Sequence, residues 1–426
     1  MSILIKNIDE IYTRKNKIEK GYILIKDNII KEVGFSNNID NIDNNYDKVI
    51  DAQGKIALPG LINTHTHAAM TLLRGYADDL PLQKWLEKKI WPFEAQLTEN
   101  DIYWGTMLAI IEMISTGTTT FTDMYFQMDK VAEAVIESGI RAILSEGLIE
   151  ANDGIQGLKK SVDFCNRWKN ERRIYTMLAP HSIYTCSKNF LQSVISYSNR
   201  YELPINIHLA ETKEEYDNCV DKYALSPVKY LDSIKLLDSP VIAAHCIYVS
   251  EEDINIISEK DVGVAYNPTS NMKLGSGIAP AVKMLNKNIN VGLGTDGAAS
   301  NNNLDMVEEA RIGSYLQKAD NLDPTAMDIS TMLDMMTISG AKALRIDKLG
   351  KIKSGSIADI ILVDITKESH FYPHHNNLSN LFYAGAGYDV DTVIVDGNIL
   401  YQNKNFLTLD TERIYYEIKK IKKKKN

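Results

Sequence analysis

Residues 61–67 read LINTHTH, and this stretch decides the fold because it predicts a buried strand that ends in two histidines. Side chains of a strand alternate between its two faces, so residues two apart point the same way. His65 and His67 have this spacing. The sequence therefore predicts two imidazoles side by side at the C-terminal end of a strand, an arrangement that suits a metal site.

Further apolar runs follow along the central part of the chain, and each has the length and composition of a short buried strand. Together with the first run they make eight strand-then-helix units over residues 59–345. This repeat predicts an α/β fold, a (β/α)8 barrel of the TIM type. The further runs are TTTFTDM (118–124), IRAILSEGLI (140–149), IYTMLAPHS (174–182), PINIHLAE (204–211), VIAAHCIYV (241–249), VGVAYNP (262–268) and INVGLGTDG (289–297).

The stretches between these runs carry helix signals. Thr98 and Asp101 predict a capping box at the start of one helix, and Gly117 is placed to end it. The alternative to a barrel is a doubly wound open sheet, which needs a Gly-rich phosphate loop after its first strand. The sequence LINTHTHAAM has no such loop, so the barrel is favoured.

The two ends of the chain have a different pattern from the centre. Segments within residues 1–58 and 346–426 are Ile- and Val-rich runs separated by Asn, Asp and Gly, which predicts strands. We expect both ends to form one small β-sandwich domain, with a C-terminal helix and a lysine tail at its end. The tail EIKKIKKKKN is expected to be a solvated helix end whose cations suit the helix dipole.

Composition limits the class of protein. The hydrophobic fraction of 44% and the charged fraction of 24% are those of a globular chain, and no run of apolar residues is long enough to span a membrane. A net charge of -9 argues against nucleic acid as a partner. The four cysteines form no CxxC pair, and the N-terminal segment lacks a signal-peptide core, so we expect free thiols and a cytoplasmic protein.

More candidate ligands fall at the ends of the predicted strands, which converge on one face of a barrel. They are His181, His208, His245 and Asp296. Imidazoles with one carboxylate suit a single divalent metal, with zinc favoured and iron or manganese as alternatives. We expect four ligands for it: His65, His67, His208 and Asp296. His245 is expected to contact a water on that metal.

Several motifs now carry a family resemblance. NTHTH, HLAET, AAHC and GTDGAASNNN together resemble the amidohydrolase superfamily, and WPFEAQLT and APHSIYTCS narrow the resemblance to the cytoplasmic 5-methylthioadenosine/S-adenosylhomocysteine deaminases. The resemblance implies hydrolysis of the 6-amino group of an adenosine-type nucleoside to an oxo group, with release of ammonia. Candidate substrates are 5-methylthioadenosine, 5′-deoxyadenosine, adenosine and S-adenosylhomocysteine. Residues 174–182 contain no lysine that could bridge two metals, which favours one.

The expected mechanism is attack of water at C6 of the purine. A bound divalent metal lowers the pKa of water to about 7. We expect Asp296 to accept the proton of that water and His245 to orient it. Glu211, three residues after His208, is the expected donor of a proton to ring N1.

Substrate binding is expected to involve the excursion after the first strand, residues 68–97. A carboxylate beside aromatic rings can accept hydrogen bonds from both ribose hydroxyls, and the resemblance assigns that role to Glu94. It also implies that His181 donates to purine N3. Trp85, in the excursion, and Ser300, in the loop after the last barrel strand, are further candidates for the pocket.

The far end of the pocket departs from the resembling family, in which arginines hold the homocysteine carboxylate. Glu146 and Gly157 stand at those places here, and Arg141, Arg172 and Arg173 are out of register. We expect Glu146 to repel a carboxylate, which makes S-adenosylhomocysteine a poorer substrate than nucleosides with small neutral 5′ groups.

Two other functions are considered. The chain could hydrolyse another amino-substituted heterocycle, such as guanine, cytosine or a triazine, but Glu94 argues against substrates that lack ribose. It could also be a non-enzymatic relative, but every expected ligand is present. We expect a small-molecule nucleoside as the substrate, a homo-oligomer, and neither nucleic acid nor membrane as a partner.

Overall fold

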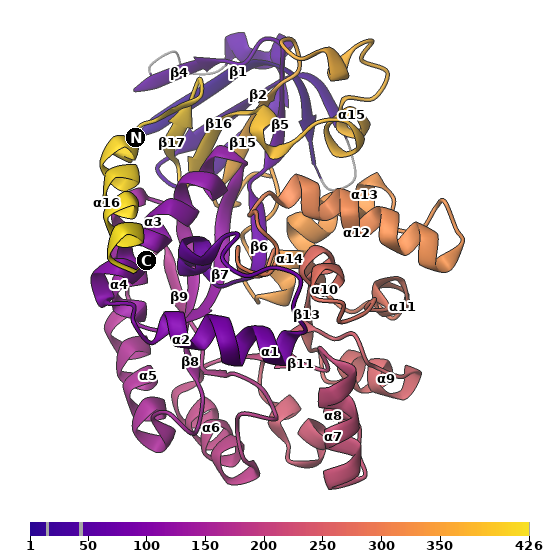
Figure 1. Cartoon of the computed structure of the whole chain (residues 1–426). Helices are drawn as coiled ribbons and strands as arrows, with labels where there is room; N and C mark the ends of the chain where they lie inside the picture. The colour runs from indigo at the N-terminus through magenta and orange to yellow at the C-terminus, as the bar shows by residue number, and fades with distance from the viewer. Residues whose placement is uncertain (14–16, 42–45, 426) are drawn as a thin grey trace.

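The computed structural model describes residues 1–13, 17–41 and 46–425 (Figure 1). Within them, the central strands lie parallel and coincide with the apolar runs of the sequence, and the fourth run is divided into two short strands. Their side chains are buried on both faces, as expected of parallel strands covered by helices. The strands are β6 Leu61–Thr66, β7 Thr118–Tyr125, β8 Arg141–Leu148, β9 Ile174–Thr176, β10 Ala179–Pro180, β11 Ile205–Leu209, β12 Val241–His245, β13 Gly263–Tyr266 and β14 Val291–Leu293.

These strands form a closed ring from two sheets. One sheet has the order β10-β8-β7-β6 with β9 paired to β8, and the other has the order β11-β12-β13-β14. A parallel bridge between Leu178 and Ile205 joins the sheets on one side. On the other side, Asp296 N donates to His65 O at 2.9 Å, so the last strand meets the first. The predicted barrel is confirmed, and its closure sets Asp296 beside the first histidine.

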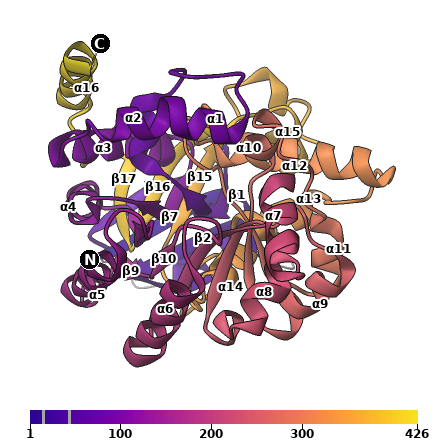
Figure 2. The same ribbon diagram turned by 60° about the horizontal axis from the view of Figure 1, so that its bottom comes forward.

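Helices surround the ring, as Figure 2 shows. Helix α3 begins with the predicted capping box of Thr98 and Asp101, and Gly117 follows its end with a φ of 90°. The helices are α3 Glu99–Ser115, α4 Met128–Ser138, α5 Gly154–Trp168, α6 Lys188–Tyr201, α7 Lys213–Tyr223, α8 Pro227–Ser233, α9 Glu251–Glu259, α10 Pro268–Lys273, α11 Ala281–Asn286, α12 Met306–Asn321, α13 Ile329–Met336 and α14 Ile338–Ala343. Among the described residues, no helix has both the length and the apolar character needed to cross a membrane.

The chain makes an excursion between β6 and α3. It consists of the 3-10 helix η2 Ala68–Leu73, the helix α1 Leu82–Trp85, a π-helical turn Leu86–Ile90 and the helix α2 Trp91–Glu94. Leu82, Trp85 and Glu94 line the same cavity as His67, so the excursion covers the C-terminal end of the barrel strands.

Strands from both termini form one sheet beside the barrel (Figure 1). Its order is β18-β17-β16-β15-β5-β1-β2-β3, with β4 paired to β1. The sheet folds back on itself: Ile30 N, in the end strand β3, donates a hydrogen bond to Ser356 O, just before β15. Ile3 and Ile360 therefore share one core, which confirms a β-domain built from both termini. The strands are β1 Ser2–Tyr12, β2 Lys17–Lys26, β3 Ile29–Phe35, β4 Lys48–Asp51, β5 Lys55–Pro59, β15 Ile360–Asp364, β16 Val390–Val395, β17 Asn398–Gln402 and β18 Asn405–Phe406.

The C-terminal helix α16, Thr411–Lys425, packs along α3 of the barrel (Figure 1). Ile414 and Ile421 are buried there, and Arg413 lies over the Trp104 ring at 5.3 Å. The apolar stripe of the helix is what selects this position. The remaining short helices are α15 Asn377–Tyr383, η1 Ser36–Asn41, η4 Leu236–Asp238, η5 Ser369–Phe371 and η6 Gly387–Asp389.

Candidate active site

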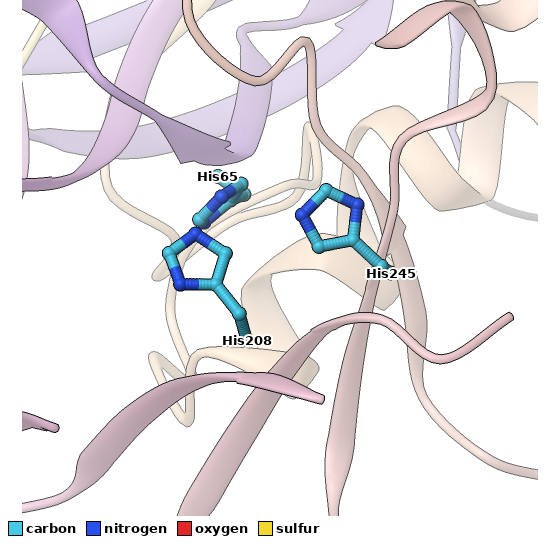
Figure 3. Close-up of side chains that lie close together, drawn as sticks. All are labelled: His65, His208 and His245. Atoms are coloured by element: carbon cyan, nitrogen blue, oxygen red, sulfur yellow. The ribbon is translucent and has the colours of Figure 1, made fainter. Parts of the chain in front are cut away.

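Histidines from three barrel strands meet at the C-terminal end of the barrel. Figure 3 shows His65, His208 and His245 with their rings turned toward one another. The ring centroid of His65 lies 4.9 Å from that of His208 and 5.5 Å from that of His245. Two sets of side chains have ligand atoms that all lie within 4.8 Å of one another: His65, His208 and His245, and His65, His67 and Asp296. The two sets share His65 and form one cluster.

The backbone brings Asp296 and His245 into this cluster at some conformational cost. Their φ angles are 61° and 74°, in the left-handed region that non-glycine residues seldom adopt. A Cβ atom at Gly294 would lie 2.8 Å from His65 N, so only glycine lets the loop after β14 approach β6 this closely. Unfavourable backbone at a cluster of polar side chains is typical of functional sites.

Oxygen atoms behind the histidines orient their rings. The Nδ1 atoms of His67, His208 and His245 lie 2.5 Å from Met124 O, 2.8 Å from His181 O and 2.8 Å from Asn271 Oδ1. Each oxygen accepts a hydrogen bond, so each Nδ1 carries the proton. This leaves the Nε2 atoms for the centre of the cluster, which is the usual arrangement of metal-binding imidazoles.

His65 differs from the others because neither of its ring nitrogens has a hydrogen-bond partner, although the residue is 0% exposed. Buried polar atoms are rarely left unpaired, and an unpaired one needs an explanation. A metal ion in the cluster would supply a partner for one of these nitrogens. The residues present therefore fit a divalent metal.

The charges of the cluster also favour a bound cation. Asp296 Oδ1 lies 3.2 Å from His67 Nε2, and Asp296 Oδ2 accepts hydrogen bonds from Ser270 Oγ at 2.6 Å and Ser300 Oγ at 2.9 Å. Although burial raises the pKa of Asp296, the hydrogen bond and charge of His67 bring it well below its usual value. Burial lowers the pKa of His67, but Asp296 outweighs this and raises it to about 9. The donor set thus attracts positive charge.

Glu211 lies beside His245 at the edge of the cluster. Its Oε2 is 3.9 Å from His245 Nε2, and the residue is 6% exposed. Burial raises the pKa of Glu211. Its backbone N–H donates to Glu215 Oε2 at 2.8 Å, and Thr212 caps the following helix α7. These contacts hold Glu211 at the end of β11.

A cavity opens above the cluster, at the C-terminal end of the barrel strands. His65 lies beneath its floor. The other predicted site residues all line the cavity, namely His67, Trp85, Glu94, His181, His208, Glu211, His245, Asp296 and Ser300. The rest of the wall is largely apolar and includes Leu82, Leu86 and Leu274. Among the described residues, the lining contains neither arginine nor lysine.

Sequence reasoning missed three polar residues. Tyr125 OH donates to Glu94 Oε1 at 2.6 Å, Asn271 accepts from His245, and Ser270 donates to Asp296. All three directly end or closely follow a barrel strand, and this position was the available signal. Which side chains they contact depends on loops that the sequence pattern does not place.

One expectation about the pocket is wrong. The carboxylate of Glu146 turns to the start of helix α4, where it accepts hydrogen bonds from Gln127 N and Met128 N at 3.3 Å each. Burial raises the pKa of Glu146 to about 7. Its neighbour Gly147 lines the cavity instead, because successive strand residues face opposite ways. Glu146 is therefore not placed to repel a substrate carboxylate.

The nearby arginines are used elsewhere. Arg141 is buried and pairs with Asp359 at 3.1 Å, and Arg172 pairs with Asp396 at 2.5 Å, which ties the barrel to the β-domain. Arg173 donates to backbone carbonyls, including that of Ile140. The three therefore serve contacts within the fold, and none of them lines the cavity.

Comparison with known proteins agrees with the resemblance seen in the motifs. Residues 56–400 match the model of the amidohydrolase family. A 5-methylthioadenosine/S-adenosylhomocysteine deaminase of Halothermothrix orenii is 56% identical, over 100% of both chains. The crystal structure of an adenosine deaminase from Xanthomonas campestris with bound zinc has a TM-score of 0.96 and 31% identity, covering 99% of this chain and 98% of that one.

A more distant neighbour shares the fold alone. The structure of a triazine hydrolase from Arthobacter aurescens has a TM-score of 0.90 and 22% identity, and the match covers 99% of both chains. The family model covers most of the present sequence, and the curated relative matches it from end to end. The chain therefore belongs to the amidohydrolase family.

Proposed function

We propose that the protein is a metal-dependent hydrolytic deaminase of adenosine-type nucleosides, which converts the 6-amino group to an oxo group and releases ammonia. One observation carries the proposal: a single cavity is lined both by the His and Asp cluster and by the buried carboxylate Glu94. The cluster suits hydrolysis, and the carboxylate suits a ribose. The name of the Halothermothrix relative supports this substrate class.

We assign the metal to His65, His67, His208 and Asp296. Zinc is favoured because the Xanthomonas deaminase contains it, and iron and manganese are alternatives that also accept imidazole and carboxylate ligands. When bound, a divalent metal supplies Lewis acidity that makes water nucleophilic near neutral pH.

The side chains around the cluster would manage the protons. Asp296 accepts one proton from the attacking water and later delivers it to the departing ammonia, and the second proton of that water passes to Glu211 as the C6 carbonyl forms. His245 has its Nδ1–H engaged with Asn271, so its Nε2 is free to accept a hydrogen bond from that water and orient it. Burial raises the pKa of Glu211 and favours the protonated form, which donates to N1 as C6 becomes tetrahedral.

Three residues would hold the nucleoside, and a fourth would support the site. Glu94 accepts hydrogen bonds from the ribose 2′- and 3′-hydroxyls, and His181 donates to purine N3. Trp85 contributes an aromatic face to the wall. Ser300 supports the site through its hydrogen bond to Asp296 Oδ2. We also propose that the substrate is a small molecule, that the protein is a homo-oligomer, and that neither nucleic acid nor membrane is a partner.

The test is ammonia release from a panel of amino-substituted heterocycles by zinc-loaded protein, with chelator-treated protein as the control. Adenosine, 5′-deoxyadenosine, 5-methylthioadenosine and S-adenosylhomocysteine represent the proposed class. Guanine, cytosine and an aminotriazine represent the alternative. Turnover confined to adenosine-type nucleosides supports the proposal. Turnover confined to the free bases or the triazine refutes it.

A further inference from the structure

We propose that Tyr125 is a positioning residue for substrate binding, whose phenol holds the Glu94 carboxylate in the orientation that accepts the two ribose hydroxyls. The inference rests on the proposed function because it requires a nucleoside in the cavity. Tyr125 OH donates to Glu94 Oε1 at 2.6 Å. Tyr125 is 3% exposed and Glu94 is 8% exposed, so water competes little for this bond.

The position of Glu94 in the chain explains why it needs such a partner. Glu94 ends helix α2 in the excursion, a segment that is not part of the barrel. Among the described side chains of Leu82–Glu94, only that of Glu94 forms a hydrogen bond with a barrel strand, and its partner is Tyr125. Trp85 Nε1 donates to Ala77 O, inside the excursion itself. Tyr125 therefore fixes the carboxylate relative to the barrel.

The end of strand β7 connects the two halves of the proposed site. Met124 O orients the His67 ring through a contact of 2.5 Å to Nδ1, and the next residue is Tyr125. The Tyr125 ring stacks on Phe126 at 4.0 Å and lies 6.3 Å from the His67 ring. One rigid strand end thus sets the distance between the ribose-binding carboxylate and the metal ligands.

The chemistry of the contact suits binding of a diol. One phenol hydrogen occupies a single lone pair of Glu94 Oε1, which leaves Oε2 and another lone pair of Oε1 as acceptors. Removing the phenol would free the carboxylate to turn and would leave it poorer in donors. Burial already raises the pKa of Glu94 to about 7, against the lowering effect of Tyr125. Without the phenol, that pKa rises further.

The test compares the wild-type enzyme with Tyr125→Phe on adenosine and on 2′,3′-dideoxyadenosine, which lacks both hydroxyls. We expect KM for adenosine to rise about 10-fold, the lower end for one charge-assisted hydrogen bond, with kcat changed less than about threefold. Kinetics on the dideoxy substrate should not change. Tyr103→Phe is the matched control because it removes another phenol-to-carboxylate bond, to Glu137 Oε2 at 2.5 Å, on the outer surface. Tyr103→Phe should change neither KM nor kcat on either substrate.

Two further readouts separate positioning from a merely structural effect. The acid limb of kcat/KM for adenosine should move to higher pH in Tyr125→Phe. In a Glu94→Ala background, which lacks the acceptor of this bond, Tyr125→Phe should no longer change KM. Equal losses on both substrates, or no loss on adenosine, overturn the inference while the proposed function stands. If the wild-type enzyme deaminates neither nucleoside, the proposed function is refuted and the inference falls with it.

Discussion

Replacing Glu211 by glutamine tests the proposed acid directly. Gln keeps the size and polarity of the side chain but has no acidic proton to give to N1. Glu211 is outside both sets of clustered ligand atoms, and its Oε2 is 3.9 Å from His245 Nε2, so the metal site should persist. General acid catalysis is worth about 10²- to 10⁴-fold. The expected loss in kcat is thus at least ~10²-fold, or about 2.7 kcal/mol of transition-state stabilisation.

The assay is ammonia release from adenosine, with metal content measured on the same protein sample. Glu214→Gln is the matched control, since Glu214 is an exposed acidic residue on helix α7, which begins just after Glu211. It should change neither quantity. Full turnover by Glu211→Gln would mean that N1 receives its proton from another group. Loss of the metal in Glu211→Gln would instead place Glu211 among the ligands.

Further predictions concern the metal, the 5′ group and pH. Single replacement of His65, His67 or His208 by alanine should remove the metal, and full occupancy by metal analysis in all three variants would contradict the ligand assignment. Nucleosides with small neutral 5′ groups should exceed S-adenosylhomocysteine in kcat/KM by about 10- to 150-fold. The reason is that the described lining offers no cation to the homocysteine carboxylate, a contact worth roughly 1.5–3 kcal/mol. Equal or better kcat/KM for S-adenosylhomocysteine in parallel kinetics would contradict this prediction. Binding of ribose needs ionised Glu94, and burial raises the pKa of Glu94 to about 7. The kcat/KM for adenosine should therefore fall as the pH drops below that value. Glu94→Gln should abolish this fall, and a fall that persists in the variant belongs to another group.

The predicted preference for small 5′ groups rests on the lining of the cavity and not on Glu146. The acid at Glu146, which motivated it, binds the start of α4 and does not face the cavity. What remains is the largely apolar wall and the absence of lysine and arginine from its described lining. Arg141 and Arg172, which the sequence offered as cations near the substrate carboxylate, form ion pairs with Asp359 and Asp396 instead.

Local pattern was enough to predict much of this protein. The spacing of His65 and His67 placed two imidazoles on one face of a strand, because alternation along a strand is a property of the backbone alone. The capping box at Thr98 is equally local, and it is present. The repeat of strand and helix units predicted the barrel, since few folds accommodate that order of elements. The roles assigned to individual residues, and the domain boundary near residue 59, remain predictions.

Only the tertiary structure decided which distant groups meet. Ring closure brings Asp296 Oδ1 within 3.6 Å of His65 Nε2, and this depends on which strand edges pair. The Tyr125–Glu94 bond depends on how the excursion folds over the barrel, where no periodic pattern sets the register. Glu146 faces away from the cavity because a shift of one residue along a strand reverses the face. Helix α16 packs on α3 rather than on the β-domain because burial of Ile414 and Ile421 needs an apolar surface of matching shape. Sequence pattern determines which faces are apolar, and packing in three dimensions determines which of them meet.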